Sequence, residues 1–124
     1  QVAVSGFFFK LRDGKVLIDN ATDCHPRTGT GLSEDKRYLY LMTIDGRMKD
    51  SVGATTDEVG KLLKYFGAYD GINMDGGGST TMVWWDPAKT GDDKTEILNV
   101  PVGAGSTPNT QRCNGNNLGV YFWK

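Results

Sequence analysis

The sequence is short of the features that mark several classes of protein. Its 124 residues carry a net charge of −1, so we expect neither a nucleic acid nor an acidic membrane surface as partner. No apolar run approaches the roughly 20 residues that span a membrane. The first residues, Gln1-Val2-Ala3-Val4, show no basic segment and no cleavage site, so no signal peptide is visible. The length fits one domain or a part of one.

Cysteine and histidine are also scarce. A disulfide between Cys24 and Cys113 would close a long loop and contribute up to ~4 kcal/mol in the chain-entropy model. We expect this bridge, and with it an extracellular or periplasmic location; the alternative is two free thiols in a reducing compartment. The single histidine, His25, cannot complete a common structural zinc site, although its place beside Cys24 leaves a metal pair open. We expect no metal and no cofactor.

Strand patterns and turn signals predict a sheet. Asp13-Gly14 and Asp45-Gly46 are turn sequences, and the 17 glycines cluster beside polar residues, which favours tight turns and close backbone packing. The predicted strands cover residues 2–10, 15–18, 38–44, 71–74, 80–85 and 118–123. The polar segments 19–30 and 87–94 are predicted to be loops.

One helix is predicted over residues 56–66. Thr55 and Glu58 fit a capping box, and Gly67 stands where a left-handed residue ends a helix. An apolar stripe follows at helical spacing, formed by Val59, Leu62, Leu63 and Phe66. Together the segments predict a mixed sheet with at least one covering helix, an α+β or α/β fold.

The run Asp75-Gly76-Gly77-Gly78-Ser79-Thr80 is the segment that most needs a reason, because glycine loses the most conformational freedom on folding. Bare N–H groups in such a loop can bind an anion. The alternative is a glycine-rich hairpin without a ligand. No lysine follows the glycines, which excludes a phosphate-binding P-loop, and the helix precedes them, which argues against a dinucleotide site. The acidic loop 86–96 has Ala88 where a calcium loop needs an oxygen ligand.

Arginines and carboxylates supply the remaining candidates for chemistry. Arginine binds phosphate through its planar fork of donors, and Arg27, Arg47 and Arg112 all lie in polar, turn-like contexts. Glycoside hydrolysis commonly uses one or two carboxylates. Glu58 already has a place in the capping box and Asp45 in a turn, so Asp75 is the strongest candidate.

Several of these segments, in this order, resemble the phosphodiester glycosidase family, which includes N-acetylglucosamine-1-phosphodiester α-N-acetylglucosaminidases. The resemblance spans nearly the whole chain, and the glycine core is its most specific part. Its pieces are Ser5-Gly6 with 11–15, Pro26-Arg27-Thr28 with Gly31, Thr43-Ile44-Asp45-Gly46-Arg47, Gly53 and Thr55 through to Gly67-Ala68, 72–80, and Arg112 with Asn116 before Leu118-Gly119-Val120.

The resemblance implies hydrolysis of a sugar-1-phosphodiester, such as an N-acetylglucosamine-1-phosphodiester, at the anomeric carbon. It implies Asp75, Asp45 and Arg27 as catalytic residues, and substrate binding by Arg47, Asn73, Gly76, Gly77, Gly78, Ser79, Thr80, Arg112 and Asn116. The arginines and the glycine loop would hold the phosphate, and Asp75 would act as nucleophile, base or stabiliser of the positive sugar carbon.

The match covers only the second part of the family domain, because an earlier Asn-Gly-Gly-Phe-Phe segment has no counterpart. We therefore expect residues 1–124 to be one domain or the C-terminal portion of one, with a missing N-terminal half or another copy of the chain as partner. Two other functions stay open. One is a non-catalytic carbohydrate- or anion-binding module, with Trp84 and Trp85 as stacking platforms unless strand alternation puts one of them in the core. The other is a structural domain with a vestigial site.

Overall fold

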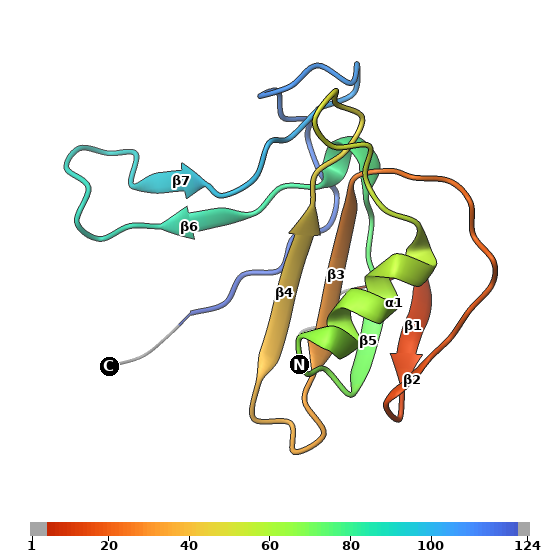
Figure 1. Cartoon of the computed structure of the whole chain (residues 1–124). Coiled ribbons are helices and arrows are strands. Elements are labelled where there is room, and N and C mark those ends of the chain that lie inside the picture. Colours follow the sequence, from red (N-terminus) through yellow and green to blue (C-terminus); the bar gives the residue numbers. More distant parts are fainter. Residues whose placement is uncertain (1–4, 122–124) are drawn as a thin grey trace.

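A five-stranded sheet with one helix on one face forms the body of the protein (Figure 1). The computed structural model describes residues 5–121. The sheet has the order β2-β1-β5-β3-β4, and β6 and β7 form a separate hairpin. The elements are β1 (Phe8–Arg12), β2 (Lys15–Val16), β3 (Arg27–Leu32), β4 (Leu39–Ile44), α1 (Thr56–Tyr65), β5 (Asp70–Asn73), the 3-10 turn η1 (Gly77–Ser79), β6 (Val83–Trp85) and β7 (Thr95–Ile97).

All strand pairs of the sheet are antiparallel, so the fold is α+β and the prediction of a mixed sheet is wrong. Strands β4 and β5 run in the same direction, but β3 lies between them and pairs antiparallel with both. Helix α1 connects β4 to β5 over this intervening strand, which makes a split β-α-β unit. The helix therefore crosses the middle of the sheet.

Strand β3 corrects the prediction of a loop over residues 19–30. Its sequence, RTGTGL, has no apolar alternation, yet it pairs along its whole length with β4 and from Gly29 to Leu32 with β5. Near the other end of the chain, strand 80–85 is shortened to β6, and β7 was not predicted. Residues 118–121 form no strand, which overturns that part of strand 118–123, and residues 122–123 lie outside the described range.

Helix α1 is capped as predicted. The hydroxyl of Thr55 accepts from the Glu58 N–H, and a Glu58 carboxylate oxygen accepts from the Thr55 N–H at 2.8 Å. At the other end Gly67 has a φ of 106°, and the Ala68 N–H donates to the Leu63 carbonyl oxygen at 2.9 Å. These bonds satisfy groups that every helix end leaves free.

The apolar stripe of the helix is narrower than predicted. Val59 and Leu63 are buried and Leu62 is half-buried, but Phe66 is 59% exposed. Phe66 is the C-cap of the helix and no longer faces the sheet. The core under α1 consists of Leu11, Val59, Leu63 and Ala68, with Val16, Tyr40, Met42 and Ile44 at its border.

Glycines let the helix approach the sheet closely. A methyl group on Gly71 would lie 2.7 Å from Leu63 Cδ1, and one on Gly29 would lie 3.0 Å from Val59 Cγ1. On the helix side, a methyl group on Gly60 would overlap the carbonyl oxygen of Lys10. A side chain at Gly60 would collide with backbone, and one at Gly29 or Gly71 would force Val59 or Leu63 to shift, so these glycines let the two layers lie this close.

A register shift in β1 buries two successive side chains. The pairing with β5 is irregular between Phe9 and Leu11, and both Lys10 and Leu11 are at most 2% exposed. The Lys10 ammonium lies 2.8 Å from Asp57 in the first turn of α1 and 3.0 Å from Asp19. Burial by itself lowers the pKa of Lys10, but the hydrogen bonds to Asp57 and Asp19 raise it above its ordinary value.

The face of the sheet opposite α1 is uncovered in the described residues. Phe9, Ile72, Thr30 and Leu41 are register partners across four strands, and side chains in register point to the same face. Phe9 and Leu41 are both exposed, so the face is apolar and open at these strands. No helix within residues 5–121 has the length and apolar character needed to cross a membrane.

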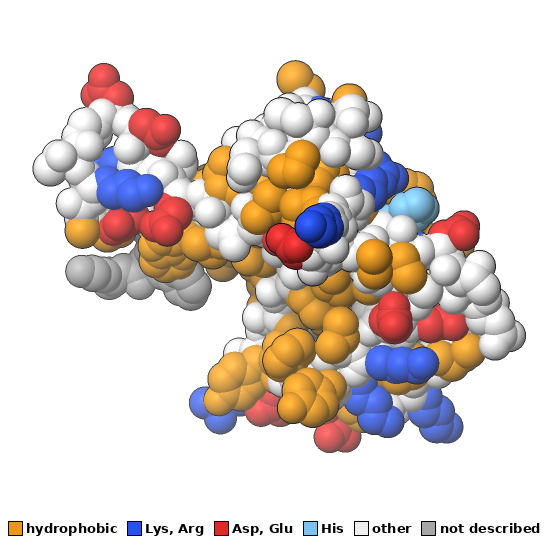
Figure 2. All heavy atoms as spheres, turned by 45° about the horizontal axis from the view of Figure 1, so that its top comes forward, with side chains coloured by type: hydrophobic (Ala, Val, Ile, Leu, Met, Phe, Trp, Pro, Cys, Tyr) orange, Lys and Arg blue, Asp and Glu red, His pale blue; other side chains and the backbone are white. Residues whose placement is uncertain are grey.

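The hairpin of β6 and β7 stands apart from the body, with charged side chains toward its far end (Figure 2). Trp84 is 51% and Trp85 59% exposed, so the alternative that strand alternation puts one of them in the core is wrong. Lys94 lies over the Trp85 ring, with 5.7 Å between the ammonium and the ring centroid. A hairpin of two strands has no second layer on which to bury an indole, which explains the exposure.

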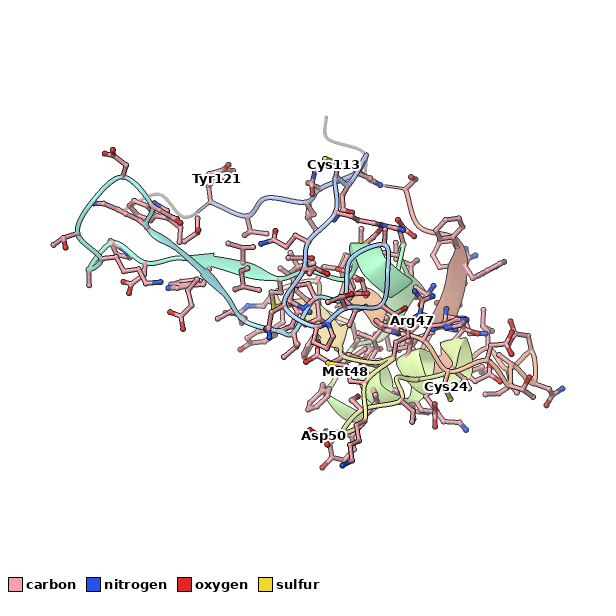
Figure 3. All side chains as sticks on the ribbon, turned by 90° about the horizontal axis from the view of Figure 1, so that it is seen from above. Cys24, Arg47, Met48, Asp50, Cys113 and Tyr121 are labelled. Atoms are coloured by element: carbon pink, nitrogen blue, oxygen red, sulfur yellow. The ribbon has the colours of Figure 1, made fainter. Side chains whose placement is uncertain are left out.

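The predicted disulfide is not formed in the structure. Cys24 and Cys113 are both free and exposed, and they lie on well-separated segments (Figure 3). Cys24 precedes β3, whereas Cys113 lies in the segment that follows the hairpin. The prediction of an extracellular or periplasmic location loses the support that the bridge would have given.

The ion pair of Lys10 and Asp57 makes the free energy of unfolding depend on pH in the acidic range. The hydrogen bond from Lys10 holds the pKa of Asp57 well below its ordinary value of 3.8. A depressed carboxyl pKa stabilises the fold above the unfolded pKa, and this contribution is lost as the pH falls below it. We expect the free energy of unfolding in urea to fall below about pH 4, and Asp57→Asn to flatten this fall while lowering stability at pH 7. Asp92→Asn, in the exposed hairpin loop, is the control; equal slopes in both variants would contradict the assignment.

Candidate functional site

A pocket of about 230 Å³ opens where β3 begins, β5 ends and α1 begins. This volume lies below the about 300–1,000 Å³ of pockets for drug-sized ligands, so it suits a group of the size of one sugar or one phosphate. We call it the basic pocket. It is lined by Phe7, Phe8, His25, Arg27, Arg47, Thr56, Asn73, Met74, Asp75, Gly76 and Gly77.

Arg27 is the first residue of β3 and is half-buried. Its Nε donates to the Ala54 carbonyl oxygen and an η nitrogen donates to the Asp23 carbonyl oxygen, both at 2.8 Å, which fixes the orientation of the guanidinium. Burial lowers the pKa of Arg27, and the neighbouring charge of Arg47 contributes in the same direction. The group stays charged, because an arginine pKa lies far above neutral pH. Two cations therefore repel each other at this pocket.

Arg47 reaches the pocket from the turn after β4. It has a φ of 57°, and the turn is closed by the Met48 N–H, which donates to the Ser51 carbonyl oxygen at 2.9 Å. Its guanidinium lies against Gly77, where an added methyl group would come within 3.1 Å of an η nitrogen. Seen from above, Arg47 lies between η1 and the start of α1 (Figure 3). Gly77, with its φ of 60°, makes room for this side chain.

The N–H groups of the glycine loop are mostly engaged inside the protein, which corrects the expectation of bare donors. The Gly76 N–H donates to an Asp75 carboxylate oxygen at 2.9 Å, and the Gly77 N–H donates to the Pro26 carbonyl oxygen at 2.8 Å. The N–H groups of Ser79 and Thr80 donate to the carbonyl oxygens of Gly76 and Gly77. A ligand in the basic pocket meets side-chain donors before it meets these N–H groups.

Close packing explains the glycines better than a ligand does. A methyl group on Gly78 would overlap the carbonyl oxygen of Gly103, and one on Gly76 would lie 2.7 Å from the Pro26 carbonyl oxygen. The loop is therefore clamped between the start of β3 and the segment around residue 103. This clamping holds Asp75 at the mouth of the pocket.

Asp75 is exposed and stands between two pockets. One of its carboxylate oxygens accepts from Gly76, and the other lies 3.8 Å from an η nitrogen of Arg112. Arg112 also donates through Nε to the Ser79 hydroxyl at 3.0 Å. The second pocket, of about 210 Å³, is lined by Ser5, Gly6, Phe7, Asp75, Gly115 and Asn116, and we call it the side pocket. Asp75 and Phe7 line both pockets.

Among the other predicted site residues, some line one of the two pockets and others line neither. Asn73 lines the basic pocket, and Asn116 lines the side pocket while its amide donates to the Ser5 hydroxyl and carbonyl oxygens at 3.2 Å. Asp45 and Thr80 line neither pocket. The Asp45 carboxylate accepts from the Val100 N–H and from the Asn99 amide at 3.0 Å, and that amide also donates to the Thr80 carbonyl oxygen.

Some lining residues were not among the predicted site residues. Phe7 and Phe8 are exposed aromatic side chains, and His25 stands beside the arginines. Thr56, the first residue of α1, places the positive end of the helix dipole at the pocket. Only His25 carried a signal in the sequence, through its position two residues before Arg27. In no part of residues 5–121 do three His, Cys, Asp or Glu side chains gather as they would to hold a metal ion.

The fold has two layers, and its polar pocket is lined by two arginines and a carboxylate. The phosphodiester glycosidase family model matches residues 1–121, so the chain belongs to the phosphodiester glycosidase family. No curated protein sequence gives a significant match.

The chain also resembles solved structures, among them the following two. One is the zebrafish N-acetylglucosamine-1-phosphodiester alpha-N-acetylglucosaminidase catalytic domain, auto-inhibited by its pro-peptide. It is 28% identical with a TM-score of 0.54, over 62% of this chain and 30% of that one. The other is a hypothetical protein from Synechocystis, 17% identical with a TM-score of 0.48, over 59% of this chain and 15% of that one. The chain therefore spans about 30% of the length of the zebrafish domain.

Because the glycine loop is packed so closely, we expect one added methyl group at Gly78 to lower the stability of the protein strongly. Gly78→Ala should destabilise the protein by about 1–3 kcal/mol or more, because the methyl group must displace the backbone at Gly103. Gly115→Ala is the matched control, since nothing lies within 4 Å of its position. The free energy of unfolding in urea measures both, and equal stability of the two variants would show that the loop is not clamped.

Proposed function

We propose that the chain carries the site at which a sugar-1-phosphodiester is hydrolysed at its anomeric carbon. The observation that supports this most is the meeting of Arg27, Arg47 and Asp75 in one small pocket. Membership of the phosphodiester glycosidase family supports the type of reaction. The zebrafish relative is named for its action on an N-acetylglucosamine-1-phosphodiester, which makes such a compound one substrate to test.

The arginines would hold the phosphate. A departing phosphate monoester carries negative charge, and fixed cations stabilise that charge without reorganising. Arg27 is already fixed by its two backbone acceptors. An anion between Arg27 and Arg47 would also relieve their mutual repulsion. In this arrangement the glycine loop supports Arg47 and Asp75, and the side chains bind the phosphate in place of the loop N–H groups.

Asp75 would act on the sugar carbon. Asp75 lines both pockets, so in this proposal the anomeric carbon would lie beside its carboxylate, with the phosphate in the basic pocket and the sugar ring extending from there toward the side pocket. The polar side chains of Ser5 and Asn116, with the ring of Phe7, would receive the sugar. Asp75 could serve as nucleophile, as base toward water, or as stabiliser of the positive carbon. Asp45 and Thr80 would not contact the substrate; both accept hydrogen bonds from the Asn99 amide and would hold the segments next to the site in position.

A non-catalytic carbohydrate-binding function is the second candidate. Trp84 and Trp85 are both exposed on a hairpin that projects from the body, which suits stacking on a ligand. Glycan binding in calorimetry without product after long incubation would support this function over hydrolysis.

Removing the charge of Asp75 tests the catalytic assignment. Asp75→Asn should lower turnover of a sugar-1-phosphodiester by about 10²–10⁴-fold while the melting temperature changes little, because the side chain is exposed. Release of free sugar from a panel of sugar-1-phosphodiesters is the measurement. Asp92→Asn should leave turnover unchanged. Full activity of the Asp75 variant would remove it from the mechanism.

Removing one cation tests the phosphate site. Arg47→Met should lower kcat/KM by about 10²–10³-fold, as expected for the loss of one preorganised donor. Arg47→Lys should recover part of the loss, since it keeps the charge but not the planar fork. Arg37→Met, on an exposed turn, is the control. If the Met and Lys variants at position 47 match the wild type, the phosphate lies elsewhere.

A further inference from the structure

One residue that lines the basic pocket has a buried side-chain oxygen without a hydrogen-bond partner among the described residues. Asn73, the last residue of β5, is 3% exposed and lines the pocket. Its amide nitrogen donates to the Met74 carbonyl oxygen at 3.0 Å, whereas its Oδ1 is buried and unpaired in the described structure. Buried polar atoms are nearly always hydrogen-bonded, so an unpaired one at a pocket wall points to a ligand.

The orientation of this amide decides which chemical group it can bind. Turning the amide over would place Oδ1 against the Met74 carbonyl oxygen, and two acceptors repel each other. The free atom is therefore an acceptor and requires a donor. A phosphodiester is ionised at neutral pH and has no hydrogen to donate. A substrate can therefore satisfy Asn73 only through a hydroxyl or an amide N–H outside its phosphate.

The position of Asn73 narrows the choice to one part of the sugar. Asn73 lies two residues before Asp75, and both line the basic pocket. If Asp75 acts at the anomeric carbon where the two pockets meet, the phosphate in the basic pocket is joined to that carbon. The sugar donor nearest to this phosphate, and so to Asn73, is the substituent on the adjacent carbon, C2. We infer that Asn73 determines specificity by accepting a hydrogen bond from a 2-hydroxyl or 2-acetamido N–H of the sugar. This inference rests on the proposed function for its placement of the sugar.

The interaction would also favour the reaction itself. Hydrogen bonds to the 2-substituent of a sugar strengthen as positive charge develops at the neighbouring carbon. A site built around an unpaired acceptor rejects an analogue that lacks the donor, because the acceptor then stays buried and unpaired. A 2-deoxy sugar should therefore bind less tightly and react more slowly.

Asn114 offers a matched comparison. Its Oδ1 is also buried and unpaired, and its amide nitrogen donates to the Ser79 carbonyl oxygen at 3.1 Å. However, Asn114 lines neither the basic pocket nor the side pocket. Asn114→Leu therefore removes the same kind of group at a place where no ligand is expected.

The test measures binding and turnover with matched sugars. Calorimetry compares a sugar 1-phosphate that carries a 2-hydroxyl or 2-acetamido group with its 2-deoxy and 3-deoxy analogues, and the assay compares the corresponding phosphodiesters. In the wild type the 2-deoxy sugar should bind at least about 10-fold more weakly and react at least about 100-fold more slowly. Asn73→Leu should bring the binding ratio to near one and abolish the difference in rate that favours the 2-substituted sugar. Asn73→Asp, which keeps an acceptor, and Asn114→Leu should preserve them.

The outcomes separate this inference from the proposed function. Binding with the expected ratios but no turnover would overturn hydrolysis and leave the role of Asn73 standing. Turnover with ratios that Asn73→Leu does not change, or a preference that follows the 3-hydroxyl, would overturn the role of Asn73 alone. If the wild type neither binds nor hydrolyses these sugars, both fail. Should Asn73→Leu not fold, as judged by its circular dichroism spectrum, ratios near one in Asn73→Asp would count against the inference.

Discussion

Helix α1 lies close to the central strands because the residues beneath it are glycines. Gly29 and Gly71 face the apolar side of the helix, and Gly60 faces the backbone of β1. This spacing closes the core around Leu63 and brings the first turn of the helix to the end of β5. The basic pocket exists because those two ends meet. A larger residue at the layer boundary would move the pocket wall as well as the core.

The glycine loop after β5 illustrates how packing can be mistaken for binding. A run of three glycines suggests bare N–H groups, but the structure uses these donors to close the loop on itself and on Pro26. The same flexibility lets Gly77 accept the Arg47 guanidinium and lets Gly78 contact Gly103. Charge in the pocket therefore comes from arginine side chains. Loop and arginines form one unit, so a substitution in either changes the position of the other.

Local signals predicted the helix and its caps, because Thr55, Glu58 and Gly67 act within one or two turns of the chain. Strand β3 was not predictable in this way. Its threonines and glycines form no local strand pattern, and the glycines are needed only because a helix from elsewhere in the sequence packs against them. Arg27, Arg47 and Asp75 were identified by residue type and Asn73 through the family resemblance, and all four line one pocket. Asp45 was identified by the same reasoning but accepts hydrogen bonds from Asn99 and Val100. Such partners depend on tertiary contacts that no local pattern contains.

The amide of Asn116 joins the last part of the described chain to Ser5, across 111 residues. Long closures of this kind form late, because the chain must lose much entropy before the contact forms. During synthesis the helix and the central strands can assemble first, while the side pocket has only one of its walls. The complete site is then among the last features to appear, and a nascent chain released early would hold a packed core beside an unfinished site.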